Sequence, residues 1–474
     1  MKQIRKNILR VAAVLTVLLI LLAGYGAYSI TTYGNRWFSS SANTFLRNKK
    51  KDVTAGDILD RNGVVLATAR DGQRVYPTDE KTRRAVVHAV GDSDGNVKNG
   101  VESFQSSALY GFNMGFLERF SCFVRGQRRT GDTVRLTIDS RLSAYIASLF
   151  PAGKKGAVTV MNYKTGEVLA ENSFPNFDPL DLTAAARDDQ QPFFNRAVQG
   201  LYAPGSTFKI VTAASALQNF SNAQTAEFQC TGLLQFGDRR VTDAGTRLEE
   251  GKITQHGTLT LAKAFQVSCN NTFAQIALSL GDERLRETAE SFGFNDNFLF
   301  RDIVVENSSY PAENRTEAEI AWTGAGQSML TASPLHMCLV AAAVANDGVI
   351  MEPKLYQSIT ASNGKTRSEL KSRVYRKAMD AETAGIIKGY MRSAVTAGTG
   401  TAANISGARV CGKTGSAEVD TQQDTNAWFV GFLDEEKSPY ALSIVVEDAG
   451  GGGSVAAPVA RKIFEWLLNN GDGA

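Results

Sequence analysis

The first pattern along this 474-residue chain is an uncharged run from Val11 to Ile30, which directly follows four basic residues: Lys2, Arg5, Lys6 and Arg10. A helix of about 20 residues spans about 30 Å, the thickness of a bilayer core. Basic residues ahead of such a span favour a cytoplasmic N-terminus. We therefore expect residues 1–33 to form a cytoplasmic tip and a single transmembrane anchor, with the remaining chain outside the cytoplasm. A cleaved signal peptide is the alternative, but the run is long for one and no clear small-x-small cleavage site ends it.

Residues 34–150 show a less regular pattern that predicts a separate pedestal or linker domain. Residues 31–55 are polar and mixed, which indicates a stalk. Residues 56–67 then predict a strand, an Asn62-Gly63 turn and a second strand. Before Pro151, apolar residues recur at helical spacing, at Leu142, Tyr145, Ile146 and Leu149. We place a domain boundary near Pro151.

After Pro151 the pattern predicts one domain, residues 151–474, whose sheet is built from both ends. Residues 157–161 and 168–170 flank a polar Lys164–Glu167 turn, as in a β-hairpin. Residues 427–432 and 440–446 are two further apolar strands, and a helical stretch at 455–469 closes the chain. The stretch between the early and late strands is mostly helical and rich in Ala and Leu. A sheet with flanking helices and a helical insert is an α+β architecture.

Composition and charge argue against several kinds of protein. A hydrophobic content of 43% and a charged content of 21% are ordinary for a globular protein. The net charge of +3, without basic runs beyond the N-terminus, argues against a nucleic-acid partner. The cysteines form no C-x-x-C pair, so we expect buried free thiols and neither a disulfide framework nor a zinc site; they are Cys122, Cys230, Cys269, Cys338 and Cys411. The three histidines lack a ligand or triad context, so we expect structural roles and no metal; they are His88, His256 and His336.

A short motif with a candidate nucleophile lies near the middle of the chain. The segment Tyr202–Gly205 ends an extended stretch, and Ser206-Thr207-Phe208-Lys209 begins an apolar helix that continues to Leu217. Residues i and i+3 share a helix face, so the Ser206 hydroxyl and the Lys209 amine are expected to point the same way. The helix N-terminus also offers unpaired N–H groups near Ser206. Alone, the pattern more often marks an N-cap serine with a surface lysine one turn later.

Two later segments favour the catalytic interpretation. Ser268-Cys269-Asn270 follows an amphipathic helix, and Lys413-Thr414-Gly415-Ser416 precedes the late strands. Together with Ser206 and Lys209, they give the S-x-x-K, S-x-N and K-T-G motifs in the order that acyl-serine enzymes require. Three independent motifs in order arise by chance far less often than any one of them.

On these motifs the chain resembles a penicillin-binding protein of class B, the transpeptidase-only kind. The resemblance extends from about Gly56 to the C-terminus and includes further segments: Phe177–Pro179, Asn195–Ala197, Tyr202–Gly205, Gly326–Gln327, Thr331–Met337, Ala345–Gly348, Thr399–Ala402 and Ala456–Pro458. It implies the α+β fold shared by penicillin-binding proteins and serine β-lactamases. One departure is Asn426, which stands where many members carry His.

The resemblance also implies an activity and a set of site residues. The activity would be D,D-transpeptidation of peptidoglycan stem peptides through an acyl-enzyme on Ser206, which β-lactams would also form. The implied catalytic residues are Ser206, Lys209, Ser268, Asn270 and Lys413, and the implied substrate-binding residues are Thr414, Gly415 and Ser416. Lys209 would activate Ser206, and the backbone N–H groups of Ser206 and Ser416 would form the oxyanion hole. A membrane-embedded glycan polymerase would be the partner.

Other functions share parts of this pattern. A D,D-carboxypeptidase would use the same residues, and a serine β-lactamase would need a Glu-x-x-Leu-Asn segment that does not occur between Asn270 and Lys413. A non-catalytic scaffold or β-lactam receptor would have lost catalytic groups, which are all present. The sequence leaves open a role in elongation, septation or sporulation.

One further motif match points to a different chemistry. Gly407–Thr414 also fits the phosphate-loop pattern G-x-x-x-x-G-K-T. That loop must follow a buried strand and open a helix, and Asn404–Ser406 is no apolar strand. We therefore expect no nucleotide site here and no cofactor.

Overall fold

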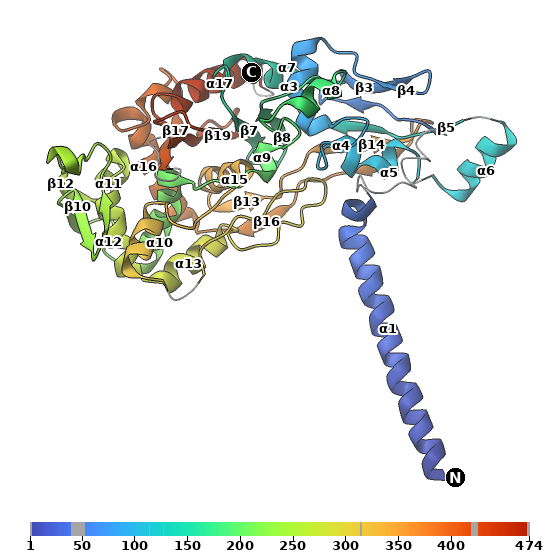
Figure 1. Cartoon of the computed structure of the whole chain (residues 1–474), viewed down its shortest axis with the longest axis horizontal. Helices are drawn as coiled ribbons and strands as arrows, with labels where there is room; N and C mark the ends of the chain where they lie inside the picture. Colours follow the sequence, from blue (N-terminus) through green and yellow to red (C-terminus); the bar gives the residue numbers. More distant parts are fainter. Residues whose placement is uncertain are drawn as a thin grey trace.

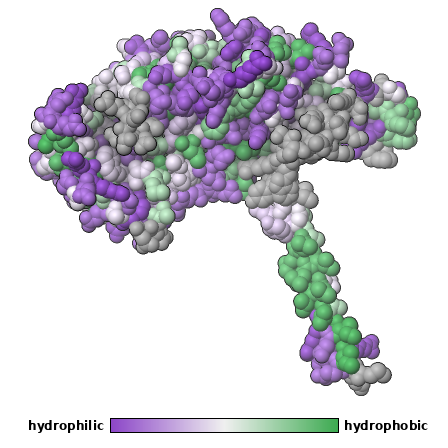
Figure 2. All heavy atoms as spheres, viewed as in Figure 1, coloured by the Kyte–Doolittle hydropathy of each residue, from purple (hydrophilic) through white to green (hydrophobic). Residues whose placement is uncertain are grey.

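The computed structural model describes residues 2–38, 53–112, 114–126, 128–312, 315–418 and 425–471. Its first helix, α1 (Lys2–Phe38), leaves the folded body as an isolated rod (Figure 1). Within it, Gln3–Ser29 is long and apolar enough to cross a membrane. Figure 2 shows a hydrophobic band along this helix and hydrophilic residues at its N-terminal end. The greater part of the expected stalk, residues 39–52, lies outside the described residues.

The N-terminal region, residues 53–150, contains short strands and helices beside the larger body (Figure 1). The expected hairpin is confirmed, because β2 (Ile58–Leu59) and β3 (Val65–Arg70) pair around the Asn62-Gly63 turn. The other strands are β1 (Val53–Thr54), β4 (Gln73–Val75), β5 (Arg129–Thr130) and β6 (Thr133–Leu136). The helices are α3 (Glu80–Val90), α4 (Val101–Phe104), α5 (Ser106–Leu109), α6 (Phe116–Val124) and α7 (Ser140–Leu149), of which α7 confirms the helix expected before Pro151.

A six-stranded sheet joins the chain on both sides of Pro151. Its strand order is β15-β14-β6-β2-β3-β4. Strands β14 (Tyr356–Thr360) and β15 (Thr366–Glu369) come from far along the chain, and β14 pairs antiparallel with β6. The buried Thr137 hydroxyl lies 2.6 Å from the Val168 carbonyl oxygen and 3.0 Å from that of Lys354, which links the two regions further. Sequence order alone does not reveal this pairing.

The main sheet has the order β17-β18-β19-β7-β8 and is antiparallel throughout. As expected, it combines an early hairpin with late strands: β7 (Gly156–Asn162), β8 (Val168–Phe174), β17 (Val410–Glu418), β18 (Thr425–Leu433) and β19 (Tyr440–Val446). The fully buried helix α15 (Pro334–Ala345) contacts β7, β18 and β19, and α17 (Ala456–Asn470) packs on β18 and β19. Apolar residues of the helices and of the sheet strands are buried together in shared cores, which confirms the α+β architecture.

The long segment between β8 and β17 is the predicted helical part, with small strands added. Its helices are α8 (Leu182–Arg187), α9 (Arg196–Gln199), α10 (Lys209–Asn219), α11 (Leu261–Val267), α12 (Asn270–Leu280), α13 (Asp282–Ser291), α14 (Glu317–Gly324) and α16 (Ala381–Ala397). Its strands are β9 (Glu227–Cys230), β10 (Leu233–Phe236), β11 (Arg239–Thr242), β12 (Gly257–Thr260), β13 (Val349–Met351) and β16 (Val374–Lys377). Strands β9 to β12 gather at the end of the molecule opposite α6 (Figure 1).

Candidate active site

Ser206 lies where a tight turn enters helix α10. Residues Gly205–Phe208 form a 3₁₀ turn, and the α-helix begins only at Lys209. The helix expected from Ser206 to Leu217 is therefore present, but its first turn is 3₁₀ and not α. Thr207 N–H and hydroxyl both bond to the Pro204 carbonyl, which closes the tighter turn, and 3₁₀ turns are frequent at helix ends.

Two glycines allow the turn to pack tightly against its neighbours. Gly205 has φ +54°, and its N–H donates to the Gly326 carbonyl at 2.9 Å. Gly326 has φ +89°, and a Cβ added there would lie 1.8 Å from the Gly205 carbonyl oxygen. Only glycine therefore fits at Gly326, since other residues carry a Cβ and rarely adopt this backbone conformation.

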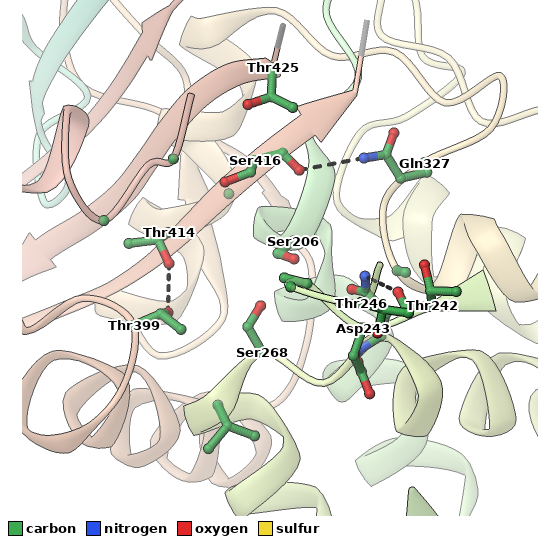
Figure 3. A pocket seen from close by; sticks show the side chains of 18 of the residues that line it. Ser206, Thr242, Asp243, Thr246, Ser268, Gln327, Thr399, Thr414, Ser416 and Thr425 are labelled. Atoms are coloured by element: carbon green, nitrogen blue, oxygen red, sulfur yellow. Dashed lines mark hydrogen bonds between the residues drawn. The ribbon is translucent and has the colours of Figure 1, made fainter. Parts of the chain in front are cut away.

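A pocket of about 530 Å³ opens at Ser206. Its lining comes from several parts of the fold: the turn before α10, the segments around β11 and α11, the end of α14 with Gln327, Thr399, the end of β17 with the start of β18, and the loop before α17. Figure 3 shows the Ser206 side chain in this pocket, with the Ser268 hydroxyl directed toward it and Ser416 on the far wall. Thr242, Gln327, Thr399 and Thr425 also line the pocket.

Lys209 is completely buried and reaches the Ser206 hydroxyl. Its Nζ lies 3.1 Å from Ser206 Oγ, 2.7 Å from the Ser268 carbonyl oxygen and 2.7 Å from Asn270 Oδ1. The two shortest contacts are to oxygens that can only accept hydrogen bonds. A neutral amine would donate its two hydrogens to these oxygens, which leaves its lone pair toward the Ser206 hydroxyl.

The S-x-N segment is held in place by the backbone conformation of Ser268 and by the side chain of Asn270. Ser268 ends α11 with φ +61°, a left-handed conformation that few side chains adopt without support. Asn270 begins α12, and its Nδ2 donates to the Thr242 carbonyl at 2.9 Å. Both ends of the Asn270 amide are therefore engaged, one with Lys209 and one with Thr242, although one amide hydrogen is left for a ligand.

Lys413 approaches the same centre from β17. Its side chain is completely buried, and its Nζ donates to Ser268 Oγ at 2.8 Å and to the Thr414 carbonyl at 3.1 Å. Ser268 Oγ also lies 3.3 Å from Lys209 Nζ. Ser268 thus connects the two lysines, and through Lys209 it connects to Ser206.

The environment lowers the pKa of both lysines. Burial lowers the pKa of Lys209 to about 8, although Cys269 and Asp243 act in the opposite direction. Burial lowers the pKa of Lys413 well below its usual value, and the nearby charge of Lys209 lowers it further. A buried ammonium loses hydration, so the neutral amine becomes accessible at moderate pH. An amine with a pKa near 8 is suited to accept a proton.

The K-T-G segment forms one edge of the main sheet. Strand β17 runs without interruption through Lys413, Thr414, Gly415 and Ser416, each paired with a residue of β18. Thr414 and Thr399 share a hydrogen bond of 2.6 Å between their hydroxyls, and the Gly452 N–H lies 3.4 Å from Ser416 Oγ. Because the chain continues as a strand where a phosphate loop would open a helix, the nucleotide interpretation of Gly407–Thr414 fails, as expected.

The structure thus brings together all eight residues that the sequence analysis named. It also adds pocket residues that the sequence analysis did not name as site residues. Gln327 and Thr399 stand in segments already noted for their resemblance, so a signal for them existed. Thr242 and Asp243 stand in no motif, and only the folding of β11 against α12 reveals them. The Asp243 Oδ1 accepts hydrogen bonds from the N–H groups of Asn270 and Asn271.

Most of the cysteines are buried free thiols and two of the histidines are structural, as expected. Cys230, Cys269, Cys338 and Cys411 are free and buried, but Cys122 is only partly buried because it lies on the short helix α6. His88 and His336 are fully buried and bond to backbone carbonyls, and burial lowers the pKa of each to about 4. Both imidazoles therefore stay neutral and structural. His256 differs, since it lines the pocket beside Asp243.

Comparisons with known proteins agree with this geometry. Residues 156–465 match the model of the penicillin-binding protein transpeptidase domain. The peptidoglycan D,D-transpeptidase PbpA of Mycolicibacterium smegmatis is 30% identical over 89% of this chain and 90% of its own length. The D,D-transpeptidase domain of a peptidoglycan glycosyltransferase from Eggerthella lenta is 31% identical, with a TM-score of 0.77 over 88% of this chain and 99% of that one.

A third relative has been captured with an antibiotic. The penicillin G acyl-enzyme complex of penicillin-binding protein A from Mycobacterium tuberculosis is 26% identical, with a TM-score of 0.77 over 88% of this chain and 99% of that chain. Both the family match and the similarity of the first relative extend over well more than half of the sequence. The chain therefore belongs to the penicillin-binding protein transpeptidase family, in its class B branch.

Proposed function

We propose that this protein is a peptidoglycan D,D-transpeptidase that works through an acyl-enzyme on Ser206 and is also acylated there by β-lactams. The observation that carries the proposal is the position of Lys209. Its Nζ lies 3.1 Å from Ser206 Oγ, while two carbonyl-type oxygens at 2.7 Å hold its hydrogens. A nucleophile beside a base that is itself oriented by a third group is the general arrangement for covalent catalysis.

Acylation begins when Ser206 Oγ attacks the carbonyl carbon between the two D-Ala residues of a stem peptide. Neutral Lys209 takes the hydroxyl proton as the new C–O bond forms. The tetrahedral oxyanion accepts hydrogen bonds from the backbone N–H groups of Ser206 and Ser416. Donors preorganised for a developing charge are commonly the largest electrostatic contribution to such a reaction.

Collapse of this intermediate breaks the peptide C–N bond, and the departing D-Ala amine needs a proton. The route from Lys209 Nζ to that amine passes Ser268 Oγ, which lies 3.3 Å from Lys209 and 2.8 Å from Lys413. Lys413, Thr414 and Ser416 bind the terminal carboxylate, with Gly415 between them in β17. Asn270 keeps Lys209 oriented and offers its remaining amide hydrogen to the substrate backbone.

The amine of a second stem peptide then attacks the acyl carbon, and Ser206 leaves with a proton. A β-lactam follows the first step, but its leaving nitrogen stays tethered to the acyl group. Of the described residues that line the pocket, Asp243 is the one with a carboxyl group, and its Oδ1 is committed to Asn270 and Asn271. This supports slow attack by water and favours transpeptidation over β-lactam hydrolysis.

The product of the reaction tests this proposal. The full-length protein in detergent is given a stem pentapeptide with a D-amino acid or a second stem peptide as acceptor, and products are separated by mass spectrometry. We expect the acceptor to be joined with loss of D-Ala, and Ser206→Ala to abolish this. A tetrapeptide produced by hydrolysis, with no acceptor product, would instead identify a D,D-carboxypeptidase. Rapid release of hydrolysed penicillin would identify a β-lactamase.

The surroundings of the enzyme form the second part of the proposal. Residues 1–33 anchor the protein in the cell membrane, residues 34–150 form a pedestal, and residues 151–474 form the transpeptidase domain outside the cytoplasm, beside a membrane-embedded glycan polymerase. The long apolar helix α1 and its basic flank support this orientation. Protease added to intact spheroplasts is expected to digest the chain beyond about Ile30, and protection would contradict it. Cross-linking in cells should recover a polymerase with the full-length chain but not with a chain that lacks α1.

A further inference from the structure

Four side chains with metal-binding atoms meet behind the S-x-N segment. Cys230 ends β9, Asp243 follows β11, His256 precedes β12, and Cys269 caps α12. Their donor atoms all lie within 4.8 Å of one another. The two cysteines and Asp243 are buried, whereas the His256 side chain is 23% exposed. Figure 3 shows the Asp243 side chain directed away from Ser206.

The distances between these atoms fit a tetrahedral ion. Asp243 Oδ2 lies 2.9 Å from Cys230 Sγ, 3.5 Å from Cys269 Sγ and 3.3 Å from His256 Nδ1. Cys230 Sγ lies 3.5 Å from His256 Nδ1. Zinc bonds of about 2.0–2.3 Å in a tetrahedron place neighbouring ligands about 3.3–3.8 Å apart. Three of these four separations therefore already lie in the required range, and the Cys230–Asp243 separation of 2.9 Å would have to lengthen by a few tenths of an ångström.

The groups around the donors also orient them toward a common centre. Asp243 uses Oδ1 for the N–H groups of Asn270 and Asn271, at 2.5 and 3.3 Å, so Oδ2 is the oxygen that faces the thiols and the imidazole. Cys269 Sγ accepts the N–H of Thr272 at 3.3 Å. Outer hydrogen bonds of this kind fix the direction of metal ligands.

The Asp243 carboxyl needs a positive partner. Its side chain is only 1% exposed, and a buried carboxylate is costly unless a cation pairs with it. Among the described residues no lysine or arginine forms an ion pair with it. Its ion-pair partner is His256, at 3.3 Å, which is charged only when protonated, and the thiols beside Oδ2 are weak donors. A dication between these four groups would supply the missing charge and use every donor.

We propose that Cys230, Asp243, His256 and Cys269 form a structural zinc site. Two thiolates, one imidazole and one carboxylate suit Zn²⁺ better than Mg²⁺ or Ca²⁺, which prefer oxygen ligands. Four protein ligands fill the tetrahedron, as in structural sites that leave no position for substrate or water. Binding of the ion displaces one proton from each thiol, and no oxidation or reduction is involved. This proposal rests on the cluster itself and does not depend on the proposed transpeptidase activity.

The site would brace the residues that organise catalysis. Cys269 lies between Ser268 and Asn270, and Asp243 bonds to the backbone of Asn270. The other two ligands belong to the β9–β12 pair, in which Cys230 faces Gly257. Zinc would therefore tie that pair to the segment that holds Lys209. Loss of the ion should loosen Ser268 and Asn270 and slow acylation.

Metal content tests the site directly and independently of any activity. The full-length protein is purified without chelator, and zinc is measured by inductively coupled plasma mass spectrometry. We expect about one zinc per chain in the wild type and in the control Cys338→Ser, which changes a buried thiol elsewhere. We expect little zinc in Cys230→Ser and His256→Ala, because losing a ligand should cost more than the roughly 10–100-fold that loss of an outer partner costs. Replacement by Co²⁺ should give the intense visible bands of a tetrahedral thiolate complex.

Several results would overturn the proposal. These are a wild-type protein that binds neither zinc nor cobalt, a Cys230→Ser/His256→Ala double variant that keeps full zinc, or a Cys230–Cys269 disulfide in the intact mass. The role of the ion is tested with fluorescent penicillin. Protein stripped of zinc by a chelator should acylate at least about tenfold more slowly and recover when zinc is restored. If acylation is absent in all samples while zinc binds as expected, the proposed function fails and the metal site stands.

Discussion

Replacing Gly326 by alanine should impair the site from outside the motif residues. A Cβ at this position would lie 1.8 Å from the Gly205 carbonyl oxygen and 3.0 Å from the Cβ of Phe208. Real Cβ atoms essentially never come within 3.0 Å of a heavy atom in a residue that is not a chain neighbour, so the Gly205 carbonyl must move by about 1.2 Å. The φ of +89° adds strain of about 1–2 kcal/mol for a residue with a side chain.

That displacement acts directly on the nucleophile. Gly205 is bonded to Ser206, and its N–H donates to the Gly326 carbonyl, so the turn cannot move without Ser206. Lys209 is fixed separately by Ser268 and Asn270, so Ser206 Oγ shifts relative to its base. A misplacement of about 1 Å commonly costs about 100-fold in rate. We therefore expect Gly326→Ala to lower the second-order acylation rate constant by about 100-fold.

The assay is acylation of the full-length protein by a fluorescent penicillin, followed on gels over time. Circular dichroism and thermal unfolding show whether the variant is folded. The matched control is Gly389→Ala in α16, where an added Cβ meets nothing within 4 Å. This control should acylate normally and be stabilised by up to about 1 kcal/mol, because alanine favours helix. A folded Gly326→Ala protein that acylates within twofold of wild type would refute the reasoning.

Three further results follow from the same structure. Because protonated Lys209 cannot accept the Ser206 proton and its pKa is about 8, the acylation rate constant should rise about tenfold per pH unit up to pH 8 and then level off; a flat profile between pH 6 and 9 would contradict this. Lys413→Ala should slow penicillin acylation more than Cys411→Ala, because Lys413 donates to Ser268 and Cys411 is a buried strand residue; the reverse order would contradict the assignment. Glu102→Ala should lower the free energy of unfolding, measured with urea, by about 3–5 kcal/mol, because it leaves the buried Arg74 without its charge partner. Arg84→Ala, which removes an exposed ion pair, should lower it by less than about 1 kcal/mol. Equal losses would show that burial is not the cause.

The fold was predictable where hydrophobic patterns are local. The hairpin of β7 and β8 and the late strands β18 and β19 carry continuous apolar runs, and the terminal helix has a clear apolar face. The pairing of β14 with β6 was not predictable, because their partner residues lie more than 200 positions apart and neither strand has a distinctive pattern. Long-range pairing depends on tertiary packing, which outweighs local propensity for short strands.

The motif residues were predictable because each motif fixes its own geometry over a few residues. Ser206 and Lys209 share a helical turn, and Lys413 to Ser416 share a strand, so short spacing suffices to identify them. The 3₁₀ character of the first turn was not predictable, since it depends on Gly205 at positive φ and on the bonds of Thr207 to the Pro204 carbonyl. Spacing also gave no hint that Ser268 contacts both lysines, because those contacts cross from α11 to α10 and to β17.

The proposed zinc ligands show where sequence spacing stops being informative. Familiar zinc patterns place two ligands within a few residues, so that one turn presents both. Here the donors fall at regular intervals of thirteen residues, and each lies at the end of a different element or directly beside it. No local segment can suggest such a site, and the absence of a C-x-x-C pair correctly described the sequence while leaving the cluster unseen. What brings the donors together is the packing of β9 and β11 against α12, with β12 paired to β9, and the same packing positions Asn270 beside Lys209. A change that separates these elements should therefore reduce zinc content and acylation together, even if it touches no ligand and no motif residue.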